Sequence, residues 1–212
     1  MSAAKILAQG VQDLGLTLSE TQQRKLLDHG DLLLKWNRVY NLTALRNQDE
    51  VLTHHILDSL SLLPPLLRHT QGQPCRVLDV GSGGGLPGAV LAIGRPEIEV
   101  TCVDTVAKKT AFIQQLAGVL ALPNLKSLHA RVESVSETWP VVVCRAFASL
   151  ADFTAWSRTA LAHGGVWLAM KGKLPEAEMA ALTDEVEVFH VEQMRVPGLA
   201  AERCLVWMRP RT

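Results

Sequence analysis

Residues 76–85 read Arg76-Val77-Leu78-Asp79-Val80-Gly81-Ser82-Gly83-Gly84-Gly85. A short, mostly apolar run leads into a glycine-rich turn, and Leu86-Pro87-Gly88 then opens a helical pattern. Glycine lets the backbone turn tightly and approach a ligand closely, and proline suits the first turn of a helix. These residues predict a strand, a ligand-binding turn, and a helix whose N-terminus presents unpaired amide groups.

Downstream of this turn, strand-like and helix-like segments alternate. We predict strands over 98–103, 125–131, 141–144 and 165–170, and helices over 108–120, 150–161 and 175–182. This alternation is typical of a parallel sheet with helices on both faces. Two last strands, 186–196 and 204–209, lie on either side of the turn Pro197-Gly198. We expect them to pair as an antiparallel hairpin that closes the sheet.

Upstream, residues 1–70 have a helical pattern. Ser19 and Gln22 fit a capping box, and the apolar spacing that follows predicts an amphipathic helix ending near Asn41. A further helix is expected over 49–60, ended by Pro64-Pro65. The chain is therefore expected to have two parts, an N-terminal helical extension (1–70) packed on the core and an α/β domain (71–212).

Composition limits the class of protein. The chain has 212 residues, 48% of them hydrophobic, and Lys plus Arg equal Asp plus Glu at 21 each, so an RNA partner requires a local basic patch. No apolar run is long enough for a membrane span, and no export signal stands at the N-terminus. The four cysteines form no Cys-x-x-Cys pair, which argues against a metal site. We expect a cytoplasmic protein without metal.

Two acidic residues indicate the cofactor. Asp79 stands before the first glycine, where it would repel a pyrophosphate but accept hydrogen bonds from the ammonium group of S-adenosylmethionine. Asp104 ends the second strand and is placed to bind ribose hydroxyls. Gly83, Gly85 and Gly88 also satisfy the G-x-G-x-x-G pattern of nicotinamide enzymes. A nicotinamide-dependent oxidoreductase therefore stays open as an alternative.

Other polar residues stand where a substrate would bind. Arg145 and Lys171 each end a predicted parallel strand, and ligands of open α/β sheets bind outside these carboxyl ends. His54 and Asp58 have the i,i+4 spacing that permits a hydrogen bond, and no third ligand for a metal is evident. Asn41 is either a helix cap or a substrate contact.

Nearly the whole chain resembles the bacterial 16S ribosomal RNA (guanine-N7)-methyltransferase G family, also called glucose-inhibited division protein B. The motifs that carry the resemblance are Asn41-Leu42-Thr43, His54-His55-x-x-Asp58-Ser59-Leu60, 79–88, Asp104 with Lys108-Lys109, Arg145-Ala146-Phe147-Ala148, and Lys171-Gly172. The chain departs from the family at Cys144, where serine is expected. The fold implied is a Rossmann-like class I S-adenosylmethionine-dependent methyltransferase with a mostly parallel sheet.

The resemblance also implies a reaction and its residues. The substrate is one guanine of 16S rRNA, expected within the small ribosomal subunit and acted on by a monomer. The family positions for the cofactor fall on Gly81, Leu86, Val132, Glu133 and Arg145. Guanine N7 has a free lone pair, so in-line attack on the methyl group needs no general base, and Arg145, Lys171, His54 and Asn41 are expected to position the substrate. A non-catalytic, ribosome-associated RNA-binding module is a further alternative.

Overall fold

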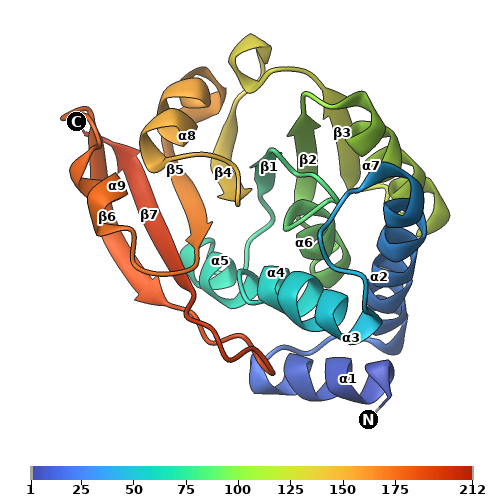
Figure 1. Ribbon diagram of the computed structural model, residues 1–212. Helices are drawn as coiled ribbons and strands as arrows, with labels where there is room; N and C mark the ends of the chain where they lie inside the picture. The colour runs from blue at the N-terminus through green and yellow to red at the C-terminus, as the bar shows by residue number, and fades with distance from the viewer. Residues whose placement is uncertain (1, 212) are drawn as a thin grey trace.

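The computed structural model describes residues 2–211 and contains one seven-stranded sheet (Figure 1). Its strands are β1 (Arg76–Val80), β2 (Glu99–Asp104), β3 (Leu125–His129), β4 (Trp139–Arg145), β5 (Leu161–Lys171), β6 (Val186–Gln193) and β7 (Cys204–Pro210). They lie in the order β3-β2-β1-β4-β5-β7-β6. The first five strands are parallel, while β7 pairs antiparallel with both β5 and β6. The predicted fold class and the closing hairpin are confirmed.

Helices cover both faces of the sheet. One face packs against α6 (Gly88–Gly94), α7 (Ala107–Val119) and the N-terminal helices, and the other packs against α8 (Leu150–Trp156) and α9 (Glu176–Ala180). Successive side chains of a strand point to opposite faces, so Val141 and Val143 enter the first core while Val142 and Cys144 enter the second. Burial on both faces explains why this central strand is apolar throughout.

The N-terminal helices share their core with the sheet. They are α1 (Ala3–Asp13), α2 (Glu20–Tyr40), α3 (Gln48–Val51), η1 (Leu52–Leu57), α4 (Asp58–Leu60) and α5 (Leu63–His69). Leu7, Leu33 and Leu60 are fully buried in the same apolar cluster as Leu91 and Ile113. Figure 1 shows α1 lying beside the α3–α4 helix, with α2 running along the side of the molecule near α7.

The helix over residues 48–60 has an unexpected feature. Its middle turn, η1, is a π-helix that carries His54 and His55. Such turns inside α-helices are frequent at functional sites. The capping box at Ser19 is confirmed, and α2 ends at Tyr40, followed by the C-cap Asn41 in the left-handed region with φ 50°. Pro64 and Pro65 do not act only as terminators, because they lie in the first turn of α5, where a missing N–H costs nothing.

Several predicted boundaries are wrong, and the largest differences are at the end of α8 and the start of β5. The helix expected over 150–161 ends at Trp156, and β5 begins at Leu161, earlier than the expected 165. Leu161 pairs with Trp139 of β4 ahead of an irregularity in the register. That pairing extends the strand through Ala162, His163 and Gly164, which have no strand-like pattern. Within residues 2–211, no helix has the length and apolar character of a membrane span.

Candidate active site

A cavity of about 200 Å³ lies at the carboxyl ends of β1, β2 and β4. It is lined by Val80, Gly81, Val103, Asp104, Thr105, Val106, Lys109, Ala130, Val132, Glu133, Ala146 and Phe147. We call it the first cavity. Its wall includes four of the residues expected to bind a cofactor, namely Gly81, Asp104, Val132 and Glu133. Parallel strands end at one edge of the sheet, which is why residues so far apart in sequence meet here.

Asp104 joins this cavity to the glycine turn. Its Oδ2 accepts a hydrogen bond from the Gly83 N–H at 3.1 Å, and its Oδ1 accepts one from the Val106 N–H at 2.9 Å. Lys109 Nζ lies 3.7 Å from Oδ2. A carboxylate oxygen has more than one acceptor position. Asp104 can therefore hold the turn and still accept hydrogen bonds from hydroxyl groups of a ligand in the cavity.

Asp79 does not line the cavity. Its side chain points to the opposite face of β1, is fully buried, and accepts a hydrogen bond from the Gly88 N–H at 2.8 Å. Burial raises the pKa of Asp79 to about 6, against the opposing effect of that hydrogen bond. Among the described residues, its Oδ1 has no partner. The structure gives Asp79 a role inside the turn, and its contact with a cofactor stays a prediction.

The remaining turn residues shape the backbone. Gly83 and Gly85 have φ of 55° and 74°, in the left-handed region that favours glycine. Gly85 packs on α6 and α7, since a Cβ there would lie 3.0 Å from that of Ala89. Leu86 is buried in the core shared with the N-terminal helices. These three residues do not line the first cavity.

The helix α2 supports the same turn from outside. His29 is fully buried, and its Nε2 lies 2.8 Å from the Gly84 carbonyl oxygen, which can only accept. Burial lowers the pKa of His29 to about 4, so the ring is neutral and Nε2–H donates. A Cβ at Gly84 would lie 2.7 Å from Leu33 Cδ1, so glycine permits this close approach.

A second cavity, of about 520 Å³, lies beside the first. It is lined by Thr43, Ala44, Leu45, His54, His55, Asp58, Arg145, Ala146, Met170, Lys171, Gly172 and Arg203. Three residues expected to position a substrate, His54, Arg145 and Lys171, are therefore brought together. Asn41 is not among them. It caps α2, and its Oδ1 accepts a hydrogen bond from Arg46 Nη2 at 3.1 Å.

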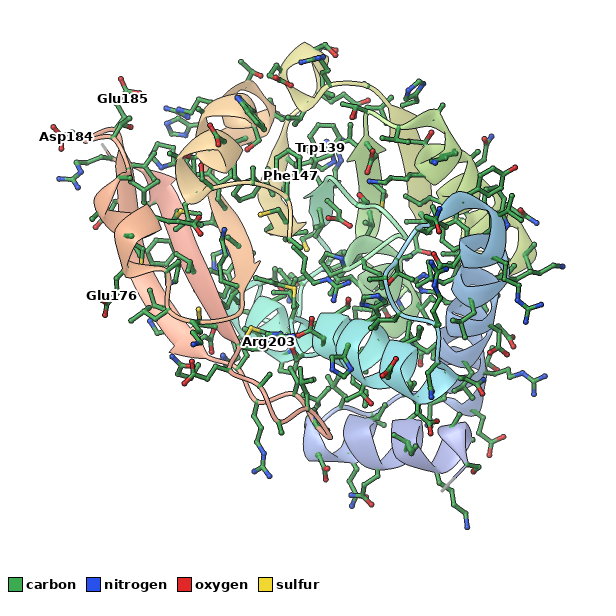
Figure 2. All side chains as sticks on the ribbon, in the orientation of Figure 1. Trp139, Phe147, Glu176, Asp184, Glu185 and Arg203 are labelled. Atoms are coloured by element: carbon green, nitrogen blue, oxygen red, sulfur yellow. The ribbon has the colours of Figure 1, made fainter. Side chains whose placement is uncertain are left out.

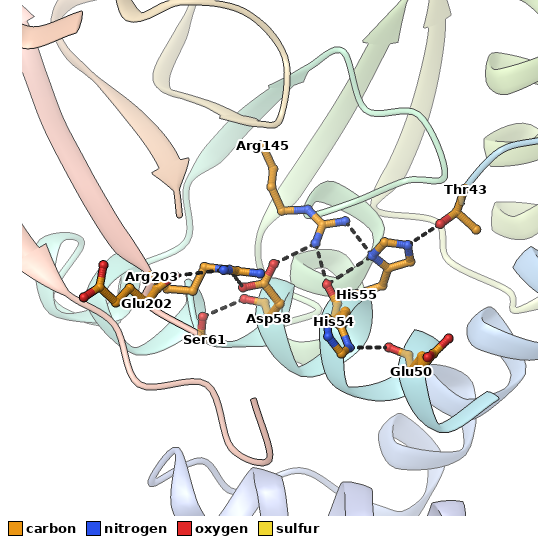
Figure 3. Close-up of polar contacts among 9 residues, drawn as sticks. All are labelled: Thr43, Glu50, His54, His55, Asp58, Ser61, Arg145, Glu202 and Arg203. Carbon is orange, nitrogen blue, oxygen red and sulfur yellow. Dashed lines mark hydrogen bonds and ion pairs between the residues drawn. The ribbon is translucent and has the colours of Figure 1, made fainter. Parts of the chain in front are cut away.

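Asp58 is the centre of a polar network in this second cavity (Figure 3). Its Oδ2 accepts from Arg145 Nη1 at 2.8 Å, and its Oδ1 accepts from Arg203 Nε at 2.9 Å. The Asp58 side chain is only 4% exposed, against 15% for Arg145 and 22% for Arg203. Arg145 Nη1 also donates to the His54 carbonyl oxygen at 2.9 Å, so β4 and the π-helical turn are held together.

His55 continues this network toward the chain that follows α2. Its Nε2 lies 2.6 Å from Thr43 Oγ1, and its Nδ1 lies 3.3 Å from Arg145 Nη2. Burial, reinforced by the Arg145 guanidinium, lowers the pKa of His55 to about 4. A neutral imidazole beside Arg145 avoids placing another cation in the cavity. Thr43 and His55 stand in motifs that carry the family resemblance but were not expected to position a substrate, and Arg203 stands in none of those motifs.

The Lys171 ammonium group makes its hydrogen bonds within the protein. It donates to Glu178 Oε2 at 2.8 Å and to the Ala148 carbonyl oxygen at 3.0 Å. The same Glu178 oxygen accepts from the Leu150 N–H at 2.8 Å. Lys171 therefore fixes the loop between β4 and α8 from one wall of the cavity. A direct contact of this lysine with substrate stays a prediction.

The two cavities meet at Ala146, which lines both. Ala146 has φ of 50°. This left-handed conformation costs a non-glycine residue roughly 1–2 kcal/mol, and such strain is concentrated at functional sites. The turn places Arg145 in the second cavity and Phe147 in the first. The Phe147 ring lies over Gly81, where a Cβ would be 2.2 Å from Phe147 Cδ2.

The arrangement is suited to group transfer between two ligands held side by side. Within residues 2–211, no group of three or more His, Cys, Asp or Glu side chains is arranged to hold a metal ion. The lining of the first cavity has the chemistry to contact a nucleotide-type ligand, because Asp104 can accept hydrogen bonds from hydroxyl groups and buried Val103 and Val132 offer apolar walls.

Comparison with known proteins identifies the family. Residues 22–206 match the family model of rRNA small subunit methyltransferase G. The ribosomal RNA small subunit methyltransferase G of Acidovorax sp. (strain JS42) is 63% identical over 212 residues, covering 96% of this chain and 94% of that protein. The protein of that name from Polaromonas sp. is 60% identical, covering 96% and 92%.

A solved structure shares the fold. Magnesium protoporphyrin IX methyltransferase from Synechocystis with bound S-adenosylmethionine matches with a TM-score of 0.59 at 14% identity, covering 85% of this chain and 97% of that one. The family match decides against the nicotinamide-dependent oxidoreductase that the glycine pattern left open. The chain belongs to the rRNA small subunit methyltransferase G family.

Proposed function

We propose that this protein transfers a methyl group from S-adenosylmethionine to N7 of a guanine in 16S rRNA. The observation that carries the proposal is the meeting of two cavities at Ala146, one suited to a nucleotide cofactor and one lined by arginines. A donor and an acceptor bound in these cavities would face each other across that residue. Family membership supports an rRNA substrate.

S-adenosylmethionine is the cofactor of the family, and it supplies the sulfonium methyl group. We infer that Asp104 binds its ribose and that Val132 and Glu133 lie against its base. The first cavity is smaller than the roughly 300–1,000 Å³ of most ligand pockets. Phe147, packed over Gly81, is the side chain whose rotation would enlarge it.

The chemistry asks for alignment more than for proton transfer. Guanine N7 is an acceptor with a free lone pair, so no proton has to leave before attack. The protein then gains rate by holding the reacting atoms about 3–3.5 Å apart and in line. Positive charge moves toward the base during the reaction, and an unpaired arginine beside N7 would oppose it. Asp58 supports this mechanism because its carboxylate pairs with Arg145 next to Ala146.

The working form that we propose is a monomer without metal that acts on the small ribosomal subunit. An rRNA substrate supports a cytoplasmic location. Because N7 lies in the deep, narrow major groove of A-form RNA, the target guanine is expected in a loop or distorted helix.

The test is transfer of labelled methyl from S-adenosylmethionine to small ribosomal subunits that lack their own modification, followed by nucleoside analysis. Label in 7-methylguanosine of 16S rRNA is the expected result. Label in another nucleoside would overturn the choice of N7. RNA binding without any transfer would favour the non-catalytic ribosome-associated module.

Replacing Asp104 with alanine is expected to weaken S-adenosylmethionine binding by roughly ten- to hundredfold. Hydrogen bonds to a charged group contribute about 1.5–3 kcal/mol, and Asp104 also holds the Gly83 and Val106 amides. Calorimetric titration measures the effect. The control is Asp28→Ala, which removes an exposed carboxylate that pairs with Arg24 on α2. Equal affinity in the two variants would contradict a ribose contact.

His29 gives a second test of the cofactor turn. His29→Leu removes the donor to the Gly84 carbonyl oxygen, and we expect about a three- to tenfold loss of cofactor affinity, as for one buried hydrogen bond. His29→Gln keeps an N–H at the end of a side chain of similar reach and is expected to bind within about twofold of the wild type. If the two variants bind equally well, α2 does not support the turn through this bond.

A further inference from the structure

The second cavity holds more positive charge than its single carboxylate can neutralise. Asp58 pairs with both Arg145 and Arg203, which leaves two cations and one anion in this cluster. Lys171 adds nothing to the excess, because Glu178 pairs with it. His55 is neutral, since burial lowers its pKa to about 4. The cluster therefore carries one uncompensated positive charge at the cavity wall.

Both guanidinium groups keep N–H donors available. Arg203 uses Nε for Asp58 and Nη1 for the Glu202 carbonyl oxygen at 2.8 Å. Its Nη2 makes no hydrogen bond to any described residue. Arg145 uses Nη1 for Asp58 and for the backbone of His54, while its Nε makes no hydrogen bond within residues 2–211. Asp58 thus fixes the orientation of two planar guanidinium groups without using all of their N–H donors.

Arg203 comes from a different part of the fold than the other members. It lies in the segment between β6 and β7 and is labelled in Figure 2. Figure 3 shows its side chain reaching toward Asp58 on the 48–60 helix. In Figure 3, Arg203 approaches Asp58 from one side, and His55 lies on the other side. The Arg145 guanidinium lies between Asp58 and His55. Arg145 adjoins Ala146, where the cavities meet, so Arg203 is the arginine further along the network from the transfer point.

We propose that Arg203 binds a backbone phosphate of the substrate RNA beside the target guanine, with Asp58 orienting it and Arg145 completing the site. The proposal rests on the proposed function, because it names how that substrate is held. Arginine matches the geometry of a phosphate group with paired N–H donors. A cation next to N7 would oppose the reaction, whereas a cation set back from the transfer point can bind phosphate without that cost. Phosphate contacts of this kind set the position of the nucleic acid.

The test uses Arg203→Gln in the full-length protein with small subunits that lack the modification. Losing one phosphate contact is expected to reduce the slope of log affinity against log salt concentration by about one. We also expect KM for the subunit to rise by roughly tenfold, with kcat within about threefold of the wild type. The control is Arg95→Gln, which makes the same charge change at an exposed ion pair with Glu97 and is expected to leave the slope and KM unchanged.

A conservative variant separates charge from structure. Arg203→Lys keeps the positive charge but loses the paired N–H donors of the guanidinium group. We therefore expect the wild-type dependence of affinity on salt concentration, while KM stays several-fold raised. An unchanged slope in Arg203→Gln would overturn the proposal, and so would a loss of kcat with KM unchanged. If Arg203→Gln fails to fold, a wild-type KM in Arg203→Lys overturns the proposal in its place. Label in a nucleoside other than 7-methylguanosine would count against the proposed function alone, because the salt slope tests the phosphate contact independently.

Discussion

Arg145→Ala is expected to lower kcat/KM for methyl transfer to small ribosomal subunits by at least about 10²-fold. The guanidinium ties β4 to Asp58 and to the His54 carbonyl oxygen, directly beside the point where the cavities meet. Its loss frees the wall of the second cavity, and a displacement of the bound base by about 1 Å is enough for a loss of that size. Labelled methyl incorporation measured against subunit concentration gives both kinetic constants.

Two further measurements show what kind of loss occurs. Arg145 lines the second cavity and not the first, so calorimetry is expected to find S-adenosylmethionine affinity within about threefold of the wild type. The family resemblance also implied a cofactor contact for Arg145, and such a contact predicts a larger loss of S-adenosylmethionine affinity. Arg209→Ala serves as control, since it breaks an exposed pair with Glu187, of the kind that contributes little, and a contact with the Phe189 ring, and none of these residues lines either cavity. Turnover equal to that control would remove Arg145 from the site.

The sheet was predictable because its strands have clear local patterns. The apolar runs, the glycine turn and the hairpin around Pro197-Gly198 appear in the structure in the expected order. The boundaries of β5 were less predictable, because its first residues join the sheet by pairing with β4 and not by their own propensity. A contact of that kind depends on the register of the neighbouring strand, which the local pattern does not carry.

The site was predictable only in part. Residues that end parallel strands, such as Asp104 and Arg145, could be placed because all such ends share one edge of the sheet. Asp79 follows the same logic of position, yet its side chain faces away from the cavity and accepts from the Gly88 amide. Strand pleat decides that direction, and a shift of one residue reverses it.

Arg203 had no local signal at all. It is 145 positions from Asp58 in the sequence, and no recognisable motif surrounds it. The spacing of His54 and Asp58 permitted a hydrogen bond between them, but within residues 2–211 no such bond forms, and His54 Nδ1 lies 3.2 Å from the Glu50 carbonyl oxygen. Asp58 pairs with two arginines instead, and this requires β4 and the segment before β7 to meet on one helix. The π-helical turn at Leu52–Leu57 also has no recognisable signal in the sequence, although its His54 carbonyl oxygen accepts a hydrogen bond from Arg145.

Asp58→Asn is expected to be the most destabilising single change in the site. The carboxylate is 4% exposed and is the only anion paired with Arg145 and Arg203 among the described residues. Breaking a buried ion pair by removing one partner costs about 3–5 kcal/mol. Both arginines are partly solvated, so we expect the lower end, near 3 kcal/mol, and a fall in Tm of roughly 6–12 °C for a chain of this size.

A double-mutant cycle tests the physical reason. If the cost arises from cations that have lost their anion, Asp58→Asn combined with Arg203→Gln should be more stable than the two separate losses add up to, because one of the cations is then gone. Coupled neighbours show such interaction energies of about 0.5–3 kcal/mol. Asp28→Asn on α2 is the matched control, since that carboxylate is 40% exposed and, within residues 2–211, pairs only with exposed Arg24. Strict additivity would mean that Asp58 stabilises the protein by packing and not as the shared counter-charge of two arginines.

The rate of methyl transfer is expected to depend on the same ion pair. Asp58→Asn leaves Arg145 unpaired beside N7 and is expected to lower kcat, whereas a rate unchanged in the folded variant would contradict the role of Asp58 in neutralising Arg145.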